Sequence, residues 1–105
     1  MAKTEYQIKM DYNHAIKEAD KLERIAKKMD QLMQKDFKNC MTRIATDWKG
    51  ETSTKYRNKS NKVVRNVEAL SKDLKITAQT VRKIARNTYQ AEKHALELAK
   101  ERTYH

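Results

Sequence analysis

Apolar residues recur at alternating steps of four and three along the first half of the chain. The series is Ile8, Tyr12, Ala15, Ala19, Leu22, Ala26, Met29, Met33, Phe37, Cys40, Ile44 and Trp48. Heptad spacing of this kind places one stripe along one face of a helix. Two successive steps of four, from Met29 through Met33 to Phe37, form a stutter, which locally unwinds a supercoil. The pattern predicts one long amphipathic helix over about 4–46.

The second half of the chain repeats the heptad spacing without a slip. Its stripe consists of Tyr56, Ser60, Val63, Val67, Leu70, Leu74, Thr77, Val81, Ile84, Thr88, Ala91, Ala95 and Leu98. The two series are separated by the segment 47–51, where Gly50 readily adopts a left-handed conformation and can end a helix. Trp48 closes the first stripe at this turn. We therefore expect a second helix over about 52–101 and a single all-α domain, an antiparallel two-helix hairpin.

A second set of apolar residues lies beside each stripe. Its members are Ile16, Ile25, Leu32 and Met41 in the first helix and Val64, Ala78, Ala85, Tyr89 and Leu96 in the second. The main stripes are rich in Ala and are interrupted by Ser60, Thr77 and Thr88, so they bury little apolar area against the entropy of ordering the chain. We expect the lateral residues to pair the hairpin with another helical chain in a four-helix bundle. The alternative is that they are ordinary scattered surface residues.

The 105-residue chain contains one Gly and no Pro, a composition that bears on its function class. Sheets, phosphate-binding loops and nucleophile elbows depend on turn residues, so this composition argues against β and α/β folds and against an enzyme. The single Cys40 and the dispersed histidines match neither a disulfide framework nor a metal-ligand spacing, and we expect no cofactor. The apolar runs are shorter than the ~20 residues of a membrane span, and the N-terminus lacks the apolar core of a secretory signal peptide.

The charge of the chain is strongly basic and unevenly distributed. Lys and Arg number 24 and Asp and Glu 14, and residues 48–105 carry +8 of the net +10. The densest basic patch consists of Lys55, Arg57, Lys59, Lys62 and Arg65. Such a run is usually a solvated helix face, but it also suits an acidic protein partner or nucleic acid. Nucleic acid is less favoured, because most aromatic residues fall on the predicted core stripe instead of an exposed stacking platform.

The tripeptide Trp48-Lys49-Gly50 lies at the midpoint of the chain, between the two predicted helices. With this arrangement the sequence resembles the WXG family of small, ESAT-like helical hairpins associated with type VII secretion. The resemblance covers nearly the whole chain, and Tyr56 lies eight residues after the Trp, where the family tends to place an aromatic. It implies homodimeric or heterodimeric four-helix bundles that are exported folded. Some members of the family bind the N-terminal helical domain of a larger effector.

The sequence departs from the family at the export motif near the end of the second helix. Many secreted members or their partners carry Tyr-x-x-x-Asp/Glu there. Tyr89 matches the aromatic position, but Lys93 occupies the acidic one, and Glu92 lies one residue early, about 100° away around the helix. The resemblance therefore implies that the export signal is absent or degenerate, and that a more acidic partner carries it.

These features together predict a non-enzymatic targeting factor or chaperone for a type VII effector. The expected partner is an acidic helical protein, either an LXG-like or other effector or a second WXG-like subunit. We expect Trp48 and Gly50 to form the turn, the basic patch to steer the partner, and Tyr89 with its neighbours to contribute to any composite export signal. The expected location is the cytoplasm before export by a route that needs no signal peptide. The alternatives are a self-contained secreted homodimer and a basic helical protein that binds nucleic acid or an anionic membrane surface.

Overall fold

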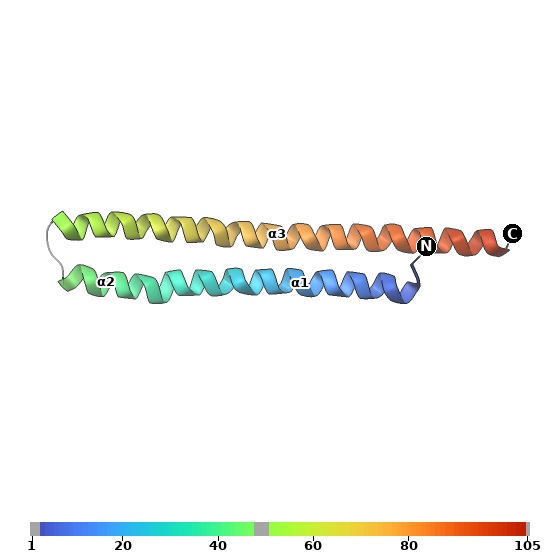
Figure 1. The fold of residues 1–105 in the computed structure, drawn as a ribbon, viewed down its shortest axis with the longest axis horizontal. Helices are drawn as coiled ribbons and strands as arrows, with labels where there is room; N and C mark the ends of the chain where they lie inside the picture. Colours follow the sequence, from blue (N-terminus) through green and yellow to red (C-terminus); the bar gives the residue numbers. More distant parts are fainter. Residues whose placement is uncertain (1–2, 48–50, 105) are drawn as a thin grey trace. The chain divides into compact units, whose positions relative to one another are not determined.

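The computed structural model describes the backbone of residues 3–47 and 51–104, and the side chains of residues 3–44 and 54–102. Its elements are α1 (Glu5–Gln31), the π-helical segment η1 (Leu32–Phe37), α2 (Lys38–Asp47) and α3 (Glu51–Tyr104) (Figure 1). The predicted all-α class is confirmed, and α3 continues a few residues past the predicted end at 101. The predicted turn residues Trp48 and Gly50 lie outside the described residues.

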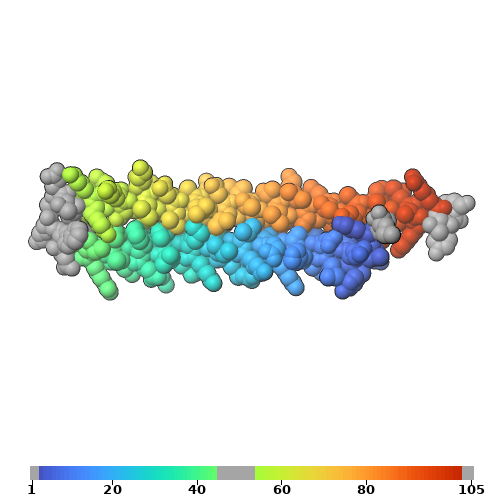
Figure 2. Space-filling view, in the orientation of Figure 1, coloured from blue at the N-terminus to red at the C-terminus, as the bar shows by residue number. Residues whose placement is uncertain are grey.

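The chain divides into two compact units, each built from segments of both halves. Unit 1 comprises Met1–Leu22 and Ile76–His105, and unit 2 comprises Glu23–Lys75. In each unit a segment from the first half packs antiparallel to a segment of α3, which confirms the predicted hairpin pairing. In the space-filling view, the cyan and green helices of unit 2 lie directly against the yellow part of α3 (Figure 2).

Helix α1 begins at Glu5 because Thr4 and Gln7 cap its first turn. The Thr4 hydroxyl accepts a hydrogen bond from the Gln7 backbone N–H at 3.2 Å, and the Gln7 side-chain oxygen accepts one from the Thr4 N–H at 3.0 Å. This reciprocal capping box satisfies two backbone donors that have no partner within the helix. The Ile8 N–H then bonds to the Thr4 carbonyl oxygen at 3.0 Å, which starts the helical ladder.

The core of unit 1 combines small residues with one aromatic pair. Ile8, Ala19, Ala78 and Ala85 are buried. The rings of Tyr12 and Tyr89 pack at a centroid distance of 5.0 Å with 47° between their planes. Their tilted arrangement is one that aromatic pairs prefer. The pair joins α1 to α3 where the flanking alanines contribute little side-chain area.

The core of unit 2 depends on a close contact between helix backbones. Ser71 is 1% exposed, and its hydroxyl donates a hydrogen bond to the backbone carbonyl oxygen of Ala26 at 3.0 Å. A serine side chain reaches the backbone of the opposite helix only when the two helices approach closely, and Ala26, itself fully buried, permits that approach. Met33 and Ser60 are also buried in this unit. Small residues therefore set the helix spacing in unit 2.

The segment η1 coincides with the stutter at Met33 and shifts the phase of the helix that follows. A π-helical turn accommodates an extra residue, so the side chains after it are rotated relative to an uninterrupted α-helix. The prediction placed Cys40 on the core stripe, and this is wrong, because Cys40 is exposed and the next residue, Met41, is half-buried. The core positions Met29, Met33 and Phe37, each four residues apart, are therefore followed by another core position four residues later, Met41.

The predicted core stripe of α3 is wrong at one position in each heptad between Ser60 and Ile84, and at every position from Thr88 to Leu98, all of which are exposed. The apolar and small residues of α3 that are buried or half-buried are Ser60, Val64, Val67, Ser71, Leu74, Ala78, Val81, Ala85, Tyr89 and Leu96. Val63, Leu70 and Ile84, which the prediction placed in the core, are exposed. The helix is rotated by about 50° relative to the prediction, because one of the two predicted positions in each heptad stays inside and the other is replaced by the next residue. Small side chains such as Ser71 permit the closer approach. The larger aliphatic residues are left facing outward.

Candidate protein-interaction face

Two sides of unit 2 can be distinguished around the contact between Ala26 and Ser71. Asp30 follows Ala26 by four residues, Lys75 follows Ser71 by four, and the two form an ion pair. Side chains the same number of residues after Ala26 and after Ser71 therefore point toward the same side of the unit. A side chain one residue earlier is rotated by about 100° in the opposite direction, toward the other side. Ile25, which precedes Ala26, and Leu70, which precedes Ser71, consequently flank the other side together.

This other side carries four exposed aliphatic residues, which we call the apolar face. Their exposed fractions are 49% for Ile25, 51% for Leu32, 45% for Val63 and 52% for Leu70. Leu32 lies one heptad after Ile25, and Leu70 one heptad after Val63, so each pair keeps the same side of its helix. Single exposed aliphatic residues are normal on a protein surface, whereas a contiguous group marks an interaction site.

The side opposite the apolar face neutralises its own charges. There Lys75 bonds to Asp30 and holds the pKa of that carboxyl below its usual range. Within α1, Glu23 pairs with Lys27 at 3.7 Å. Both of these carboxylates are therefore engaged by lysines of this chain.

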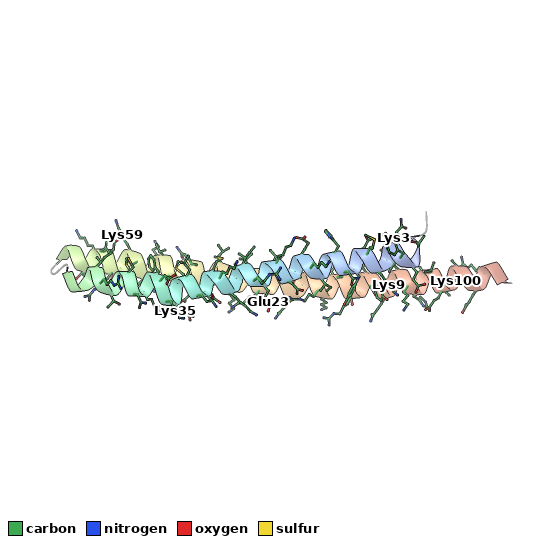
Figure 3. All side chains as sticks on the ribbon, turned by 90° about the horizontal axis from the view of Figure 1, so that it is seen from below. Lys3, Lys9, Glu23, Lys35, Lys59 and Lys100 are labelled. Atoms are coloured by element: carbon green, nitrogen blue, oxygen red, sulfur yellow. The ribbon has the colours of Figure 1, made fainter. Side chains whose placement is uncertain are left out.

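Two exposed lysines, Lys28 and Lys35, lie on the first half of unit 2 in different positions relative to the apolar face. Lys28 lies three residues after Ile25, one turn away in α1. Lys35 lies within η1, where that spacing does not hold, and it extends from the same edge as Glu23 (Figure 3). Neither lysine takes part in an ion pair with the described side chains. Figure 3 shows Lys35 and Lys59 among the side chains that extend from unit 2. The unit has fourteen Lys and Arg against seven Asp and Glu, a net charge of +7.

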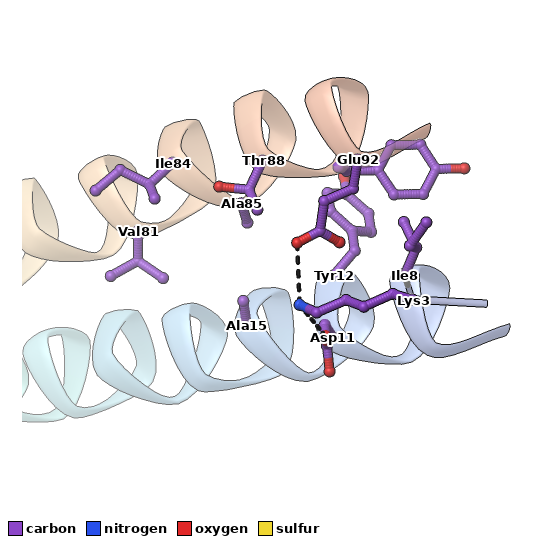
Figure 4. Close-up of a pocket in the computed structure, with 11 residues that line it drawn as sticks. Lys3, Ile8, Asp11, Tyr12, Ala15, Val81, Ile84, Ala85, Thr88 and Glu92 are labelled. Atoms are coloured by element: carbon purple, nitrogen blue, oxygen red, sulfur yellow. Dashed lines mark hydrogen bonds and ion pairs between the residues drawn. The ribbon is translucent and has the colours of Figure 1, made fainter. Parts of the chain in front are cut away.

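Unit 1 holds a mainly apolar cleft of about 240 Å³ between α1 and α3. Apolar parts of its wall include Ile8 and Ala15 from α1 and Val81 from α3. Lys3 lies at its edge, where its Nζ atom is 2.8 Å from Asp11 and 3.0 Å from Glu92 (Figure 4). These hydrogen bonds, the one to Asp11 first, raise the pKa of Lys3.

The residues predicted for the export signal lie together in unit 1. The Lys93 Nζ atom is 5.6 Å from the centroid of the Tyr89 ring, so the two residues share one helical face, as their spacing predicts. Tyr89 also packs against Tyr12, and Glu92 is engaged by Lys3. Each of the three predicted residues therefore has a contact within the chain.

The predicted basic patch on α3 is exposed but is not confined to one side of the helix. Lys55, Lys59 and Lys62 fall within about 60° of arc, whereas Arg57 points to the opposite half of the helix. Sequence reasoning missed Lys28 and Lys35, because the first half of the chain is nearly neutral overall.

The described residues include no group of His, Cys, Asp and Glu arranged to hold a metal ion. Among the described helices, none is long and apolar enough to cross a membrane. Comparisons of the chain with protein-family models, with curated proteins and with solved structures found no match.

Proposed function

We propose that this chain is a non-enzymatic partner protein that binds the helical domain of a type VII secretion effector and aids its export. The observation that supports the proposal is the apolar face of unit 2, formed by Ile25, Leu32, Val63 and Leu70. A helical surface of this kind is buried most simply by a second pair of helices, in a four-helix bundle. The partner accordingly is a helical protein, such as an LXG-like effector or a second WXG-like subunit.

The size of the apolar face indicates how much of the partner must be engaged. Fully burying an aliphatic side chain contributes roughly 1.5–3 kcal/mol, and these four are already about half-buried. They therefore contribute about 3–6 kcal/mol together, which does not clearly exceed the estimated cost of association, about 4–15 kcal/mol. The complex needs further contacts along the helices, which a long helical hairpin provides and a short peptide loop does not.

The assignment to type VII secretion rests on the resemblance to the WXG family. Trp48-Lys49-Gly50 separates the two halves of the chain, and those halves pair antiparallel as hairpins of that family do. The proposal places the chain in the cytoplasm before export, by a route that needs no signal peptide.

Lys93 indicates that the chain depends on its partner for export. In the family motif a carboxylate follows the aromatic residue by four positions, and a receptor built for a carboxylate rejects an ammonium group. We expect secretion to stop when the co-transcribed partners are deleted from a strain with an intact secretion system, and Lys93→Glu to restore some export. Undiminished protein in the medium of the deletion strain, without lysis, would contradict this part of the proposal.

The function is tested by co-expressing the chain with the proteins encoded beside its gene and purifying the complexes. The double substitution Ile25→Ser with Leu70→Ser should abolish a complex that the native chain forms. Ile76→Ser is the matched control, because Ile76 is 51% exposed but lies outside the apolar face. A stable monomer that captures none of these proteins would overturn the proposal. A self-contained dimer in light scattering would favour the secreted homodimer instead.

A further inference from the structure

We infer that a second cleft of unit 1 binds an elongated organic dianion, a small molecule with an acid group at each end. The inference goes beyond the proposed function and does not depend on it. The cleft, which we call the Lys9 cleft, has a volume of about 450 Å³, within the range of about 300–1,000 Å³ that small-molecule sites occupy. Its wall consists of Lys9, Tyr12, Asn13, Arg86, Tyr89 and Gln90.

The Lys9 cleft is distinct from the cleft that Lys3 borders. Ile84 precedes the buried Ala85 and lines the cleft at Lys3, whereas Arg86 follows Ala85 and lines the Lys9 cleft. Residues two apart in a helix differ by about 200° in direction. The two clefts therefore open on opposite sides of α3, with the tyrosine pair between them.

The wall of the Lys9 cleft has the same order of side chains on both helices. Each helix contributes a cation, a tyrosine three residues later and an amide four residues later: Lys9, Tyr12 and Asn13 on α1, and Arg86, Tyr89 and Gln90 on α3. Residues three and four apart are neighbours on a helix surface, so each set shares one face. The two sets meet where the tyrosine rings pack at a centroid distance of 5.0 Å.

The antiparallel pairing separates the two cations along the cleft. Lys9 lies three residues before Tyr12 and Arg86 three before Tyr89, so the cations lie in opposite directions from the tyrosine pair. At 1.5 Å per residue, their Cα atoms are roughly 9 Å apart along the helix axes. Helical side chains lean toward the N-terminus of their own helix, which in this pair turns the two cations further apart. An elongated dianion therefore fits them better than a single small oxyanion does.

The wall of the Lys9 cleft contains cations and amides but no carboxylate. Of the nearby acidic residues, Asp11 and Glu92 are both held by Lys3 at the other cleft. No ion pair among the described residues engages Lys9 or Arg86. A carboxylate or phosphate group at each end of a ligand supplies the missing counter-charge, because guanidinium and ammonium groups both donate charge-assisted hydrogen bonds to these anions.

The small extent of the cleft favours a small dianion over nucleic acid. Single-stranded nucleic acid also presents successive phosphates, but proteins bind it with a basic groove that follows several nucleotides. The Lys9 cleft has only two cations in its wall. The tyrosines between them offer a surface for the planar or apolar middle of a small ligand.

The test titrates the full chain at low salt with three biphenyl probes, by isothermal titration calorimetry. One probe has a carboxylate at each end, its isomer diphenate has both carboxylates beside the bond between the rings, and the third has a single terminal carboxylate. The terminal dianion should bind at least about tenfold more tightly than either of the others, because only it reaches both cations. Equal binding of the terminal dianion and diphenate, or no binding of the terminal dianion, would overturn the inference.

Four single substitutions test where the dianion binds. Lys9→Gln and Arg86→Gln should each remove most of the preference for the terminal dianion, because each leaves one cation in the cleft. The matched controls, Lys17→Gln on α1 and Lys83→Gln on α3, remove exposed lysines outside the cleft and should keep the preference. An equal loss in the controls would overturn the assignment to the Lys9 cleft. Circular dichroism of each variant checks that its helices remain intact.

Competition distinguishes the small dianion from nucleic acid. An oligothymidylate at the same concentration as the terminal dianion should leave the bound dianion in place. Displacement of the dianion by the oligonucleotide, with Lys9→Gln and Arg86→Gln each weakening the binding of the oligonucleotide, would reassign the cleft to nucleic acid and overturn the inference.

Discussion

Unit 1 and unit 2 are built from the same two halves of the chain, yet they treat the same heptad position differently. In unit 1, Glu18 precedes the buried Ala19 and bonds to Lys21 at 3.2 Å. One heptad later, in unit 2, Ile25 precedes the buried Ala26 and is about half-exposed. In the first half of the chain, the position that flanks the helix contact therefore changes from a carboxylate to an aliphatic side chain. On α3 both units place an exposed aliphatic residue there, Ile84 in unit 1 and Leu70 in unit 2.

The two units also differ in how they balance charge. Unit 1 bridges its helices with Lys3 to Glu92 and with Arg82 to Asp20 at 2.8 Å, and its net charge is +3. Unit 2 has a net charge of +7. Both units expose large hydrophobic side chains, among them Ile84 in unit 1 and Leu70 in unit 2. The units therefore differ mainly in charge and in the ion pairs that bridge their helices.

The largest expected effect comes from truncating the buried side chain of each unit. Ile8→Ala in unit 1 and Met33→Ala in unit 2 should each lower the free energy of unfolding by about 2–5 kcal/mol, because each leaves a cavity. Hydrogen exchange should show the loss of protection chiefly in the unit that carries the substitution. An equal loss of protection in both units, for both variants, would show that the two units unfold together. The distinction between the units would then be wrong.

A smaller effect on stability is expected from two single substitutions at neighbouring positions of unit 2, one in the core and one on the surface. Ser71→Leu should destabilise the chain by about 1–3 kcal/mol, because a large side chain separates the closely packed helices and removes the bond to Ala26. Leu70→Ser should change stability by only about 0.5 kcal/mol, since Leu70 is half-exposed. Urea denaturation measures both variants. A larger loss for Leu70→Ser would show that it belongs to the core after all.

The aromatic pair of unit 1 should have a measurable but modest coupling. In a double-mutant cycle, Tyr12→Leu and Tyr89→Leu should reveal about 0.5–1.5 kcal/mol of interaction between the two rings. Urea denaturation of the four proteins supplies the cycle. A coupling near zero would mean that the rings contribute only their buried area.

The smallest effects are expected at opposite extremes of pH. The folded-state pKa of Asp30 is lowered from 3.8, so the stability it contributes is present at neutral pH and is lost as pH falls below that value. The folded-state pKa of Lys3 is raised from 10.5, so its contribution is present below that value and is lost as pH rises through the higher folded-state value. The first change should weaken unit 2 and the second unit 1.

The controls for this prediction are the variants that remove each titrating group. Asp30→Asn should approach the native chain in stability as the pH falls through the acid range, and Lys3→Gln should do so as the pH rises through the alkaline range. Denaturation at a series of pH values measures both differences. A stability difference that stays constant with pH would show that the corresponding ion pair contributes nothing through its charge.

Much of the candidate interaction face was recognisable in the sequence, but its role was not. Ile25 and Leu32 were predicted as lateral residues for a second helical chain, and they are exposed as that prediction requires. The same prediction is wrong for the lateral residues of α3, which are buried or half-buried: Val64, Ala78, Ala85, Tyr89 and Leu96. Val63 and Leu70 were predicted to lie in the core, and this was wrong.

The amino-acid pattern by itself determined that the chain forms long helices, that the two halves pair, and that the first helix changes phase near Met33. Helical period and the scarcity of turn residues suffice for these features, because both act locally along the chain. Only the tertiary structure decided which stripe of α3 packs inside. Counting hydrophobicity ranks Leu70 above Ser71, but the hydrogen bond from Ser71 to Ala26 requires the helices to approach closely. Small side chains facing each other permit that approach, and it leaves the larger aliphatic residues on the surface.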